Sequence, residues 1–294
     1  MRKSNKEISI IIPTRGRFGK LIEMMDSALN LASSPELIEF VLYIDNDDPS
    51  YEALDRKVVI IRGNRIDMGL MNNLCIQKST GRIIMLCNDD VIVRTEKWDD
   101  TIYKSAKVYD DNMFLLYPND LHKGSRLCAF PIFSKELYLR YPGIFPEKYK
   151  GAFIDSHILD VFVQLKGLGV NRIKYLSNVI FEHLHYTIGK SKFDKTYSDR
   201  GRFSDDDSFI LYSNLRIKLS CKIANDTNEE PLCNHNLNRS PVLEKMNSFQ
   251  FIKKNTLMFL LSNAPFLYRS KLWIYMISRR VYKILMHLLK DCSL

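Results

Sequence analysis

An Asn-Asp-Asp run at positions 88–90 is the part of this sequence best suited to chemistry. The five residues before it, 83–87, are apolar, which is typical of a short buried strand. At the end of such a strand, Asp89 and Asp90 would repel each other unless a cation or a shared proton lay between them. A divalent ion that also binds phosphate oxygens would meet this need. A plain turn is the alternative, because Asn and Asp favour turns.

The elements around this run predict the edge of a parallel sheet. Apolar runs predict four strands, at residues 7–12, 37–44, 58–61 and 82–87. Helical spacing predicts two helices, at residues 18–32 and 69–78. The alternation indicates an α/β fold with a doubly wound, mostly parallel sheet flanked by helices. Ligands bind such sheets beyond the carboxyl ends of the strands. Asp45, like Asp89, follows a predicted strand.

The rest of the chain divides into a continuation of this domain and a helical tail. Further elements are expected at 95–109, 153–166 and 205–221 (helices), and at 113–117, 127–133 and 179–185 (strands). A loop at 141–151 is either substrate-binding or an ordinary surface loop. Asp205 to Asp207 is expected to open a helix rather than to bind metal. We therefore predict a catalytic domain at 1–222, a linker at 223–244 and a basic amphipathic helical segment at 245–294.

Composition supports a packed core and limits the partners. Of the 294 residues, 46% are hydrophobic and 26% are charged. The net charge is +9, but residues 241–294 hold nine basic and two acidic residues and so carry +7 of it. A nucleic-acid surface along the whole chain is therefore not implied. Helices with an apolar face and a basic rim suit an anionic membrane surface, and equally suit packing on protein.

The cysteines and the apolar stretches indicate a compartment. None of the six cysteines forms a Cys-x-x-Cys pair, which predicts a reducing compartment without a disulfide framework. The spacing of Cys221, Cys233 and His235 fits no common zinc pattern. No signal-peptide core and no apolar stretch of about 18 residues is present. We expect a cytoplasmic protein, with the tail as a peripheral contact on the inner face of the membrane.

A family resemblance joins these motifs. Residues 8–17, Ile-Ser-Ile-Ile-Ile-Pro-Thr-Arg-Gly-Arg, resemble the start of a GT-A fold glycosyltransferase of the family-two group, which is inverting and uses nucleotide-diphospho-sugars. Asp45, Asn72-Asn73, Thr80-Gly81-Arg82 and Asn88-Asp89-Asp90 follow in that family's order and spacing. The resemblance is strong over 7–100 and weaker to about 210. Many members have Asp-x-Asp where this chain has Asn-Asp-Asp.

The resemblance implies a donor site and a metal site. It assigns donor binding to seven residues: Pro13, Thr14, Arg15, Arg17, Asp45, Asn73 and Asp89. It implies Mn²⁺ or Mg²⁺ on Asp89, Asp90 and His183, where the metal acts on the leaving diphosphate as a Lewis acid. The alternatives are a solvated loop for the arginines, a turn for Asp45 and a structural role for His183. A basic segment at 189–197 could close over the donor phosphates.

The resemblance also implies the catalytic base. Inverting members place an aspartate at a helix start, and Asp155 holds that place, with Asp160 in reserve. The alternative is that Asp155 only stabilises the helix dipole.

The expected function is metal-dependent, inverting transfer of a sugar, in polysaccharide biosynthesis. The donor would be a nucleotide-diphospho-sugar, with a UDP-sugar favoured, and the acceptor a hydroxyl on a glycan or a lipid-linked glycan. No nucleic-acid partner is expected. One alternative is a sugar nucleotidyltransferase, although the Gly-rich opening loop of that class is missing. A second is a non-catalytic binding module, against which the retained Asp89, Asp90 and His183 argue.

Overall fold

The computed structural model describes residues 6–52, 54–55, 58–194, 198, 201–228 and 243–291. The chain divides into two compact units. The first unit comprises Met1–Leu159 and Arg172–Arg200, and the second comprises Asp160–Asn171 and Gly201–Leu294. The functional division predicted from the sequence, with a linker at 223–244, stays a prediction.

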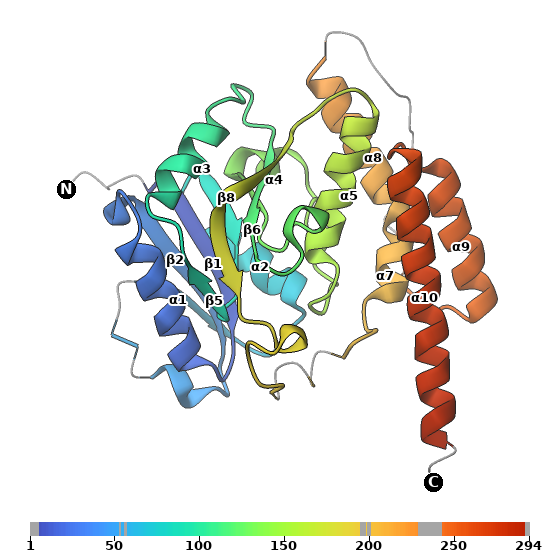
Figure 1. Ribbon diagram of the computed structural model, residues 1–294, viewed down its shortest axis with the longest axis horizontal. Coiled ribbons are helices and arrows are strands. Elements are labelled where there is room, and N and C mark those ends of the chain that lie inside the picture. The colour runs from blue at the N-terminus through green and yellow to red at the C-terminus, as the bar shows by residue number, and fades with distance from the viewer. Residues whose placement is uncertain are drawn as a thin grey trace. The chain divides into compact units, whose positions relative to one another are not determined.

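An eight-stranded sheet forms the centre of the first unit (Figure 1). Its strands are β1 (Ile8–Thr14), β2 (Ile38–Asp45), β3 (Val59–Gly63), β4 (Ile83–Leu86), β5 (Val91–Val93), β6 (Leu115–Asn119), β7 (Ile132–Ser134) and β8 (Ile173–His183). The order across the sheet is β3-β2-β1-β4-β7-β6-β8-β5. The first four strands are parallel, as are β6 and β8, whereas β7 and β5 run antiparallel to their neighbours. The predicted α/β fold is confirmed, with a sheet that is mixed beyond β4.

Helices cover both faces of this sheet, as Figure 1 shows. They are α1 (Phe18–Asn30), α2 (Met68–Lys78), α3 (Trp98–Ala106) and α4 (Lys135–Arg140). This unit also holds the start of α5 (Ile154–Gly167) and the short 3₁₀ turns η1 (Pro35–Leu37), η2 (Pro49–Tyr51), η3 (Gly124–Arg126) and η4 (Tyr186–Ile188). Alternate residues of β1 point to opposite faces. Ile8, Ile10 and Ile12 therefore pack with α1 and α3 in one buried cluster, while α2 packs on the other face.

The second unit is helical. It contains α7 (Asp206–Leu211), α8 (Ser213–Asp226), α9 (Ser248–Leu261), α10 (Phe266–Asp291) and the C-terminal part of α5. The expected start of a helix at Asp205 to Asp207 is confirmed, but the single helix expected over 205–221 is two helices. Asp206 binds Arg279 at 2.6 Å, so this acid anchors α10. Within the described ranges, no helix has the length and apolarity needed to span a membrane.

The cysteines depart from the prediction at one position. Cys75, Cys87 and Cys128 are buried and free, in agreement with the expectation. Cys221, in α8, is disulfide-bonded. The expected absence of disulfides is therefore wrong at this position. The other two residues of the discounted zinc pattern, Cys233 and His235, lie outside the described residues.

Candidate active site at the carboxyl edge of the sheet

Three segments meet beyond the carboxyl ends of β1 and β4. The apolar run of β1 ends at Thr14, whose hydroxyl donates to Asp89 at 2.7 Å. The loop after β1 carries Arg17, whose Nη1 donates to Asp89 at 3.0 Å and to Asp90 at 3.3 Å. The Arg17 side chain is only 8% exposed, so these contacts are buried. The structure therefore brings the predicted Thr14, Arg17 and paired acids into one cluster.

Burial dominates the electrostatics of Asp89. The carboxyl is removed from water, which raises its pKa to about 6, and the positive charge of Arg17 only partly offsets this effect. Asp90 adds a like charge that acts in the same direction as burial. An added cation would lower the cost of ionising both carboxylates.

Asp90 and His183 face each other because of a short strand that the sequence pattern did not predict. β5 pairs antiparallel with β8 and sets Val91 opposite His183. The backbone amide of Leu184 then donates to the carbonyl of Asp90 at 2.8 Å. These contacts place His183 Nε2 at 3.2 Å from Oδ1 of Asp90. A ladder between residues almost 100 positions apart thus assembles this pair.

The donor set suits a divalent cation in part. Two ligands in adjacent octahedral positions, each about 2.1 Å from the metal, lie about 3 Å apart. The separation of the Asp90 oxygen and the His183 nitrogen matches this value. Asp89, by contrast, already accepts from Thr14 and Arg17. Among the described residues, no group of three His, Cys, Asp or Glu side chains is arranged to hold a metal. Of the three predicted metal ligands, Asp90 and His183 therefore lie at ligand spacing, whereas Asp89 is held by Arg17.

A second arginine organises the end of β2. Arg15 Nη1 donates to Asp45 at 2.6 Å, and its two terminal nitrogens donate to the carboxylate of Asp47 at 2.5 and 2.9 Å. The hydrogen bond from Arg15 is the main cause of a lowered pKa at Asp47. Asp45 is buried, and its Oδ1 has no hydrogen-bond partner within the described part of the chain. This oxygen can accept a bond from a ligand.

Two predicted donor residues have structural contacts. Pro13 lies in β1, half-buried and paired with Tyr43 of β2. Asn73, buried in α2, donates to the carbonyl of Phe145 at 3.0 Å. Gly69, one turn earlier, donates its amide to Tyr149 at 2.8 Å. In the structure Asn73 therefore fastens the loop between α4 and α5 to α2.

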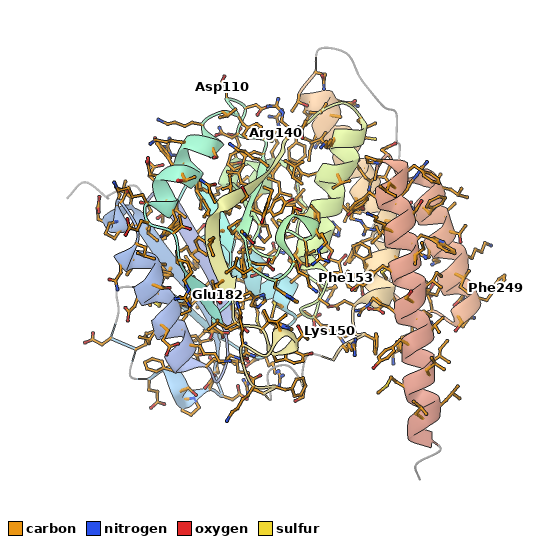
Figure 2. The ribbon with its side chains drawn as sticks, in the orientation of Figure 1. Asp110, Arg140, Lys150, Phe153, Glu182 and Phe249 are labelled. Carbon is orange, nitrogen blue, oxygen red and sulfur yellow. The ribbon has the colours of Figure 1, made fainter. Side chains whose placement is uncertain are left out.

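The candidate base Asp155 stands in the first turn of α5, at the end of this loop. Phe153, two residues before it, has the left-handed φ of 63°, which is rare for a bulky side chain. Asp155 accepts the backbone amide of Ser156 at 2.6 Å. Burial, and to a smaller degree the charge of Asp155, raises the pKa of the Cys128 thiol, so these two side chains are close. Figure 2 shows Phe153 at the start of α5.

The reserve candidate Asp160 has a different setting. It is buried in the second unit, where Arg216 Nε donates to it at 2.6 Å and Gln164 at 2.9 Å. Arg216 is itself fully buried. These contacts make Asp160 a structural residue and leave Asp155 as the candidate base.

The sequence pattern missed three residues of this region. Tyr51 in η2 contacts the hydroxyl of Thr14 at 2.5 Å and accepts the amide of Arg17 at 3.2 Å. Asp194 binds Arg17 through both carboxylate oxygens. Asp120 accepts three backbone amides of the loop that follows it, at 2.7–3.1 Å. The only signal for Asp120 was its place after a predicted strand, and no local pattern marked Tyr51. Asp194 falls in the segment at 189–197 that was expected near the donor phosphates, but no pattern paired it with Arg17.

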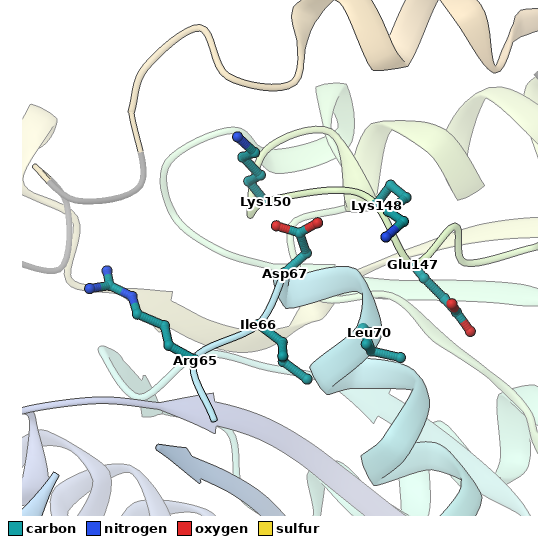
Figure 3. Close-up of a pocket in the computed structure, with 7 residues that line it drawn as sticks. All are labelled: Arg65, Ile66, Asp67, Leu70, Glu147, Lys148 and Lys150. Carbon is teal, nitrogen blue, oxygen red and sulfur yellow. The ribbon is translucent and has the colours of Figure 1, made fainter. Parts of the chain in front are cut away.

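A pocket of about 620 Å³ opens beside this edge of the sheet (Figure 3). Its walls come from the segment after β3 and from the loop before α5, and the lining residues are Arg65, Ile66, Asp67, Leu70, Glu147, Lys148 and Lys150. Arg65 also helps to lower the pKa of Asp47, which links the pocket to the Arg15 cluster. The walls are therefore polar and carry charges of both signs.

Comparison with known proteins identifies the domain. Residues 9–118 match the family described as Glycosyl transferase family 2. No curated protein matches the chain significantly. The matched residues include β1, β2 and β4 and the Asp45 and Asp89 strand ends, so the match and the predicted resemblance coincide.

Solved structures are similar at low sequence identity. A structure titled as a mycobacterial protein has 16% identity, a TM-score of 0.50, and coverage of 73% of this chain and 76% of its own. TarS 1-349 of S. aureus in complex with UDP-GlcNAc has 14% identity, a TM-score of 0.48, and coverage of 87% and 81%. The mannosyltransferase PcManGT of Pyrobaculum calidifontis, in complex with GDP-Man and Mn²⁺, has 11% identity, a TM-score of 0.48, and coverage of 96% and 88%. The match places a glycosyl transferase family 2 domain at residues 9–118, on the fold and around the strand ends described above.

Proposed function

We propose that this chain transfers a sugar from a nucleotide-diphospho-sugar to an acceptor hydroxyl, with a divalent cation and inversion at the anomeric carbon. The observation that carries the proposal is the convergence of Arg17, Asp89, Asp90 and His183 at the carboxyl edge of the sheet. An arginine, two carboxylates and an imidazole are the groups that a cation and a diphosphate need together.

The nucleoside would bind at the end of β2. The buried Oδ1 of Asp45 is ready to accept a hydrogen bond, and a nucleobase N–H or a ribose hydroxyl can supply one. Arg15 holds the other oxygen of Asp45 and so fixes the direction of the carboxylate. Pro13 and Thr14 would line the same pocket from β1. A UDP-sugar stays the favoured donor, and the uracil N–H is one group that could donate to this acceptor.

The cation would bind between Asp90 and His183. Their 3.2 Å separation suits adjacent ligand positions of Mn²⁺ or Mg²⁺, and Asp89 would join them or hold the ribose. The cation would supply positive charge to the leaving diphosphate. His183 must be neutral at Nε2 to act as a ligand. Arg17 would add a charge-assisted hydrogen bond to the same leaving group.

Asp155 would act as the general base. The segment 128–130 would connect the two halves of the site, because the charge of Asp155 acts on Cys128 and the Phe130 ring meets His183 with centroids 5.3 Å apart. A base on one side and a diphosphate-binding cluster on the other is the arrangement an inverting displacement requires. The carboxylate would take the proton of the acceptor hydroxyl while the diphosphate leaves.

The acceptor would enter along the pocket in Figure 3. The loop that supplies Lys148 and Lys150 continues directly to Asp155, so an acceptor seated there would reach the base. Polar walls of both charges suit hydroxyl-rich glycans, including a lipid-linked glycan used in polysaccharide synthesis.

The donor proposal is tested by binding. Sugars activated with UDP, GDP, dTDP and CMP are each added with Mn²⁺, and thermal stabilisation is measured. We expect one class to stabilise the protein and Asp45→Asn to weaken that effect. Asp155→Asn should bind the same donor yet fail to transfer sugar. If none of the four classes stabilises the protein, the donor site is refuted.

The C-terminal helices would contact an anionic membrane from outside. α9 and α10 expose many apolar side chains, among them Leu260, Phe266 and Leu267 near the turn between the helices, and Lys253 and Lys271 are exposed beside them. Figure 2 shows Phe249 projecting from α9. Exposed apolar groups with flanking lysines suit an anionic surface. Arg279 and Arg280, however, bind Asp206 and Asp207, so they contribute little to that surface.

Sedimentation with vesicles tests this contact. The chain should bind vesicles with anionic lipids more strongly than neutral vesicles. A variant with Leu260, Phe266 and Leu267 all changed to Ser should lose most of that binding and keep its folded signal. Equal binding by the variant and the wild type would remove the membrane proposal.

A further inference from the structure

The guanidinium of Arg17 has carboxylates on two sides. Nη1 points to Asp89 and Asp90, as described above. The opposite edge of the group points to Asp194, with Nε at 2.8 Å from one oxygen and Nη2 at 2.8 Å from the other. Two parallel bonds from one arginine edge form the fork that also recognises phosphate. Asp194 thus holds the edge of Arg17 that fits a phosphate best.

Asp194 is not a buried structural acid. Its side chain is 32% exposed, whereas those of Asp89 and Asp90 are 6% and 2% exposed. It lies beyond η4, in a segment that follows β8, and Lys20 also lies near it, at 3.8 Å. A partly exposed carboxylate on a connecting segment can leave its partner at lower cost than the two buried ones.

The Arg17 guanidinium is shared among three acidic side chains. Three carboxylates, Asp89, Asp90 and Asp194, bind one guanidinium. A divalent cation with a nucleoside diphosphate brings its own anionic oxygens to this place. Those oxygens and Asp194 would then compete for the edge of Arg17 formed by Nε and Nη2, because Asp194 already occupies it.

We propose that Asp194 is a positioning residue that stands in for the donor diphosphate on Arg17. It holds the guanidinium against Asp89 and Asp90 before the donor binds, and it releases the phosphate-binding edge when the diphosphate arrives. The inference rests on the proposed donor site and adds a residue that sets its affinity. Asp194 is then an internal competitor, and its loss tightens the binding of nucleoside diphosphates.

A purely structural Asp194 would behave in the opposite way. If the carboxylate only ordered the segment after η4, its loss would leave Arg17 less well placed and would weaken diphosphate binding. The sign of the change in affinity therefore separates the two roles. A neutral replacement of the same shape is the sharpest probe, because it removes the charge and keeps the volume.

Calorimetric titration with UDP, GDP and dTDP, each in the presence of Mn²⁺, tests the inference on the full chain. For the nucleotide that binds the wild type, Asp194→Asn should lower Kd about tenfold, the effect of losing one charged competitor. The KM of the matching donor sugar should fall in parallel without a rise in kcat. Asp194→Glu should bind like the wild type. Asp100→Asn is the matched control, because Asp100 pairs only with exposed Lys104 on α3.

The outcomes separate this inference from the function on which it depends. A wild type that binds none of UDP, GDP and dTDP refutes the diphosphate site and the role of Asp194 with it. A wild type that binds, beside an Asp194→Asn variant with equal or weaker affinity, overturns the role of Asp194 alone. Tighter binding by Asp194→Asn, with no change in Asp100→Asn, supports it.

Discussion

His183 Nε2 lies 3.2 Å from Oδ1 of Asp90, although the two residues are 93 positions apart in the sequence. β5 and β8 hold them together through the pairing of Val91 with His183 and through the bond from Leu184 to the carbonyl of Asp90. A backbone ladder, rather than a flexible loop, therefore sets the spacing of the pair. Fixed spacing is what a cation site requires.

This spacing predicts how activity depends on Mn²⁺. His183→Ala should raise the Mn²⁺ concentration for half-maximal sugar transfer about 10- to 100-fold, because one ligand is lost while the ladder remains. Titration of activity with Mn²⁺ measures this shift. His157→Ala, which alters a buried histidine that contacts Tyr149, should leave the Mn²⁺ dependence unchanged. An unaltered Mn²⁺ dependence in His183→Ala would remove this residue from the metal site.

The raised pKa of Asp89 predicts that the stability of the metal-free protein depends on pH. Its pKa is about 6 when folded and about 3.8 otherwise, so ionising it costs more in the folded state. The contribution of Asp89 to stability is therefore fully present below pH 3.8 and is lost as the pH rises through about 6. The loss is on the order of 3 kcal/mol. Urea denaturation with EDTA should show it as a difference between the wild type and Asp89→Asn that changes between pH 4 and 7. A difference that stays constant over this range would contradict the prediction.

The strand-end acids and the order of elements could be predicted because they follow from local patterns. An apolar run that ends in acids marks a strand end wherever it occurs, and Asp45 and Asp89 were found in this way. The contact of Arg17 with Asp194 could not be found, because 177 residues separate the two and no local pattern pairs them. For the same reason the three-residue strand β5 was missed: its strand partner is the distant β8.

The tail shows a second limit of sequence patterns. Counting charges predicted a basic surface, but the count cannot tell which side chains are already paired. Arg279 and Arg280 bind the acids that open α7. The disulfide at Cys221 is a similar case, because spacing alone did not indicate it.

The close packing of Gly69 predicts that the loop leading to Asp155 must keep its position for sugar transfer. A Cβ at this position would lie 2.3 Å from the carbonyl oxygen of Pro146 and 2.8 Å from that of Glu147, and these backbone atoms cannot give way without moving the loop. Gly69→Ala should therefore cost about 1–3 kcal/mol of stability and reduce sugar transfer more than donor binding. Gly19→Ala is the matched control. Its Cβ meets nothing within 4 Å on helix α1, so stability should rise by up to about 1 kcal/mol. Equal transfer rates in the two variants would show that the loop position does not matter.

Among the changes considered in the helical unit, we expect the loss of Arg216 to reduce stability most. It is fully buried, donates to Asp160 at 2.6 Å and to the carbonyl of Phe209 at 2.6 Å, and lies over the Phe209 ring. Arg216→Met should cost about 3–5 kcal/mol in urea denaturation, because it leaves the buried Asp160 carboxylate without its cation. The double variant Asp160→Leu with Arg216→Met should recover much of this loss, since no buried charge remains. If the double variant were as unstable as the sum of both single variants, packing of Arg216, rather than its charge, would hold these helices together.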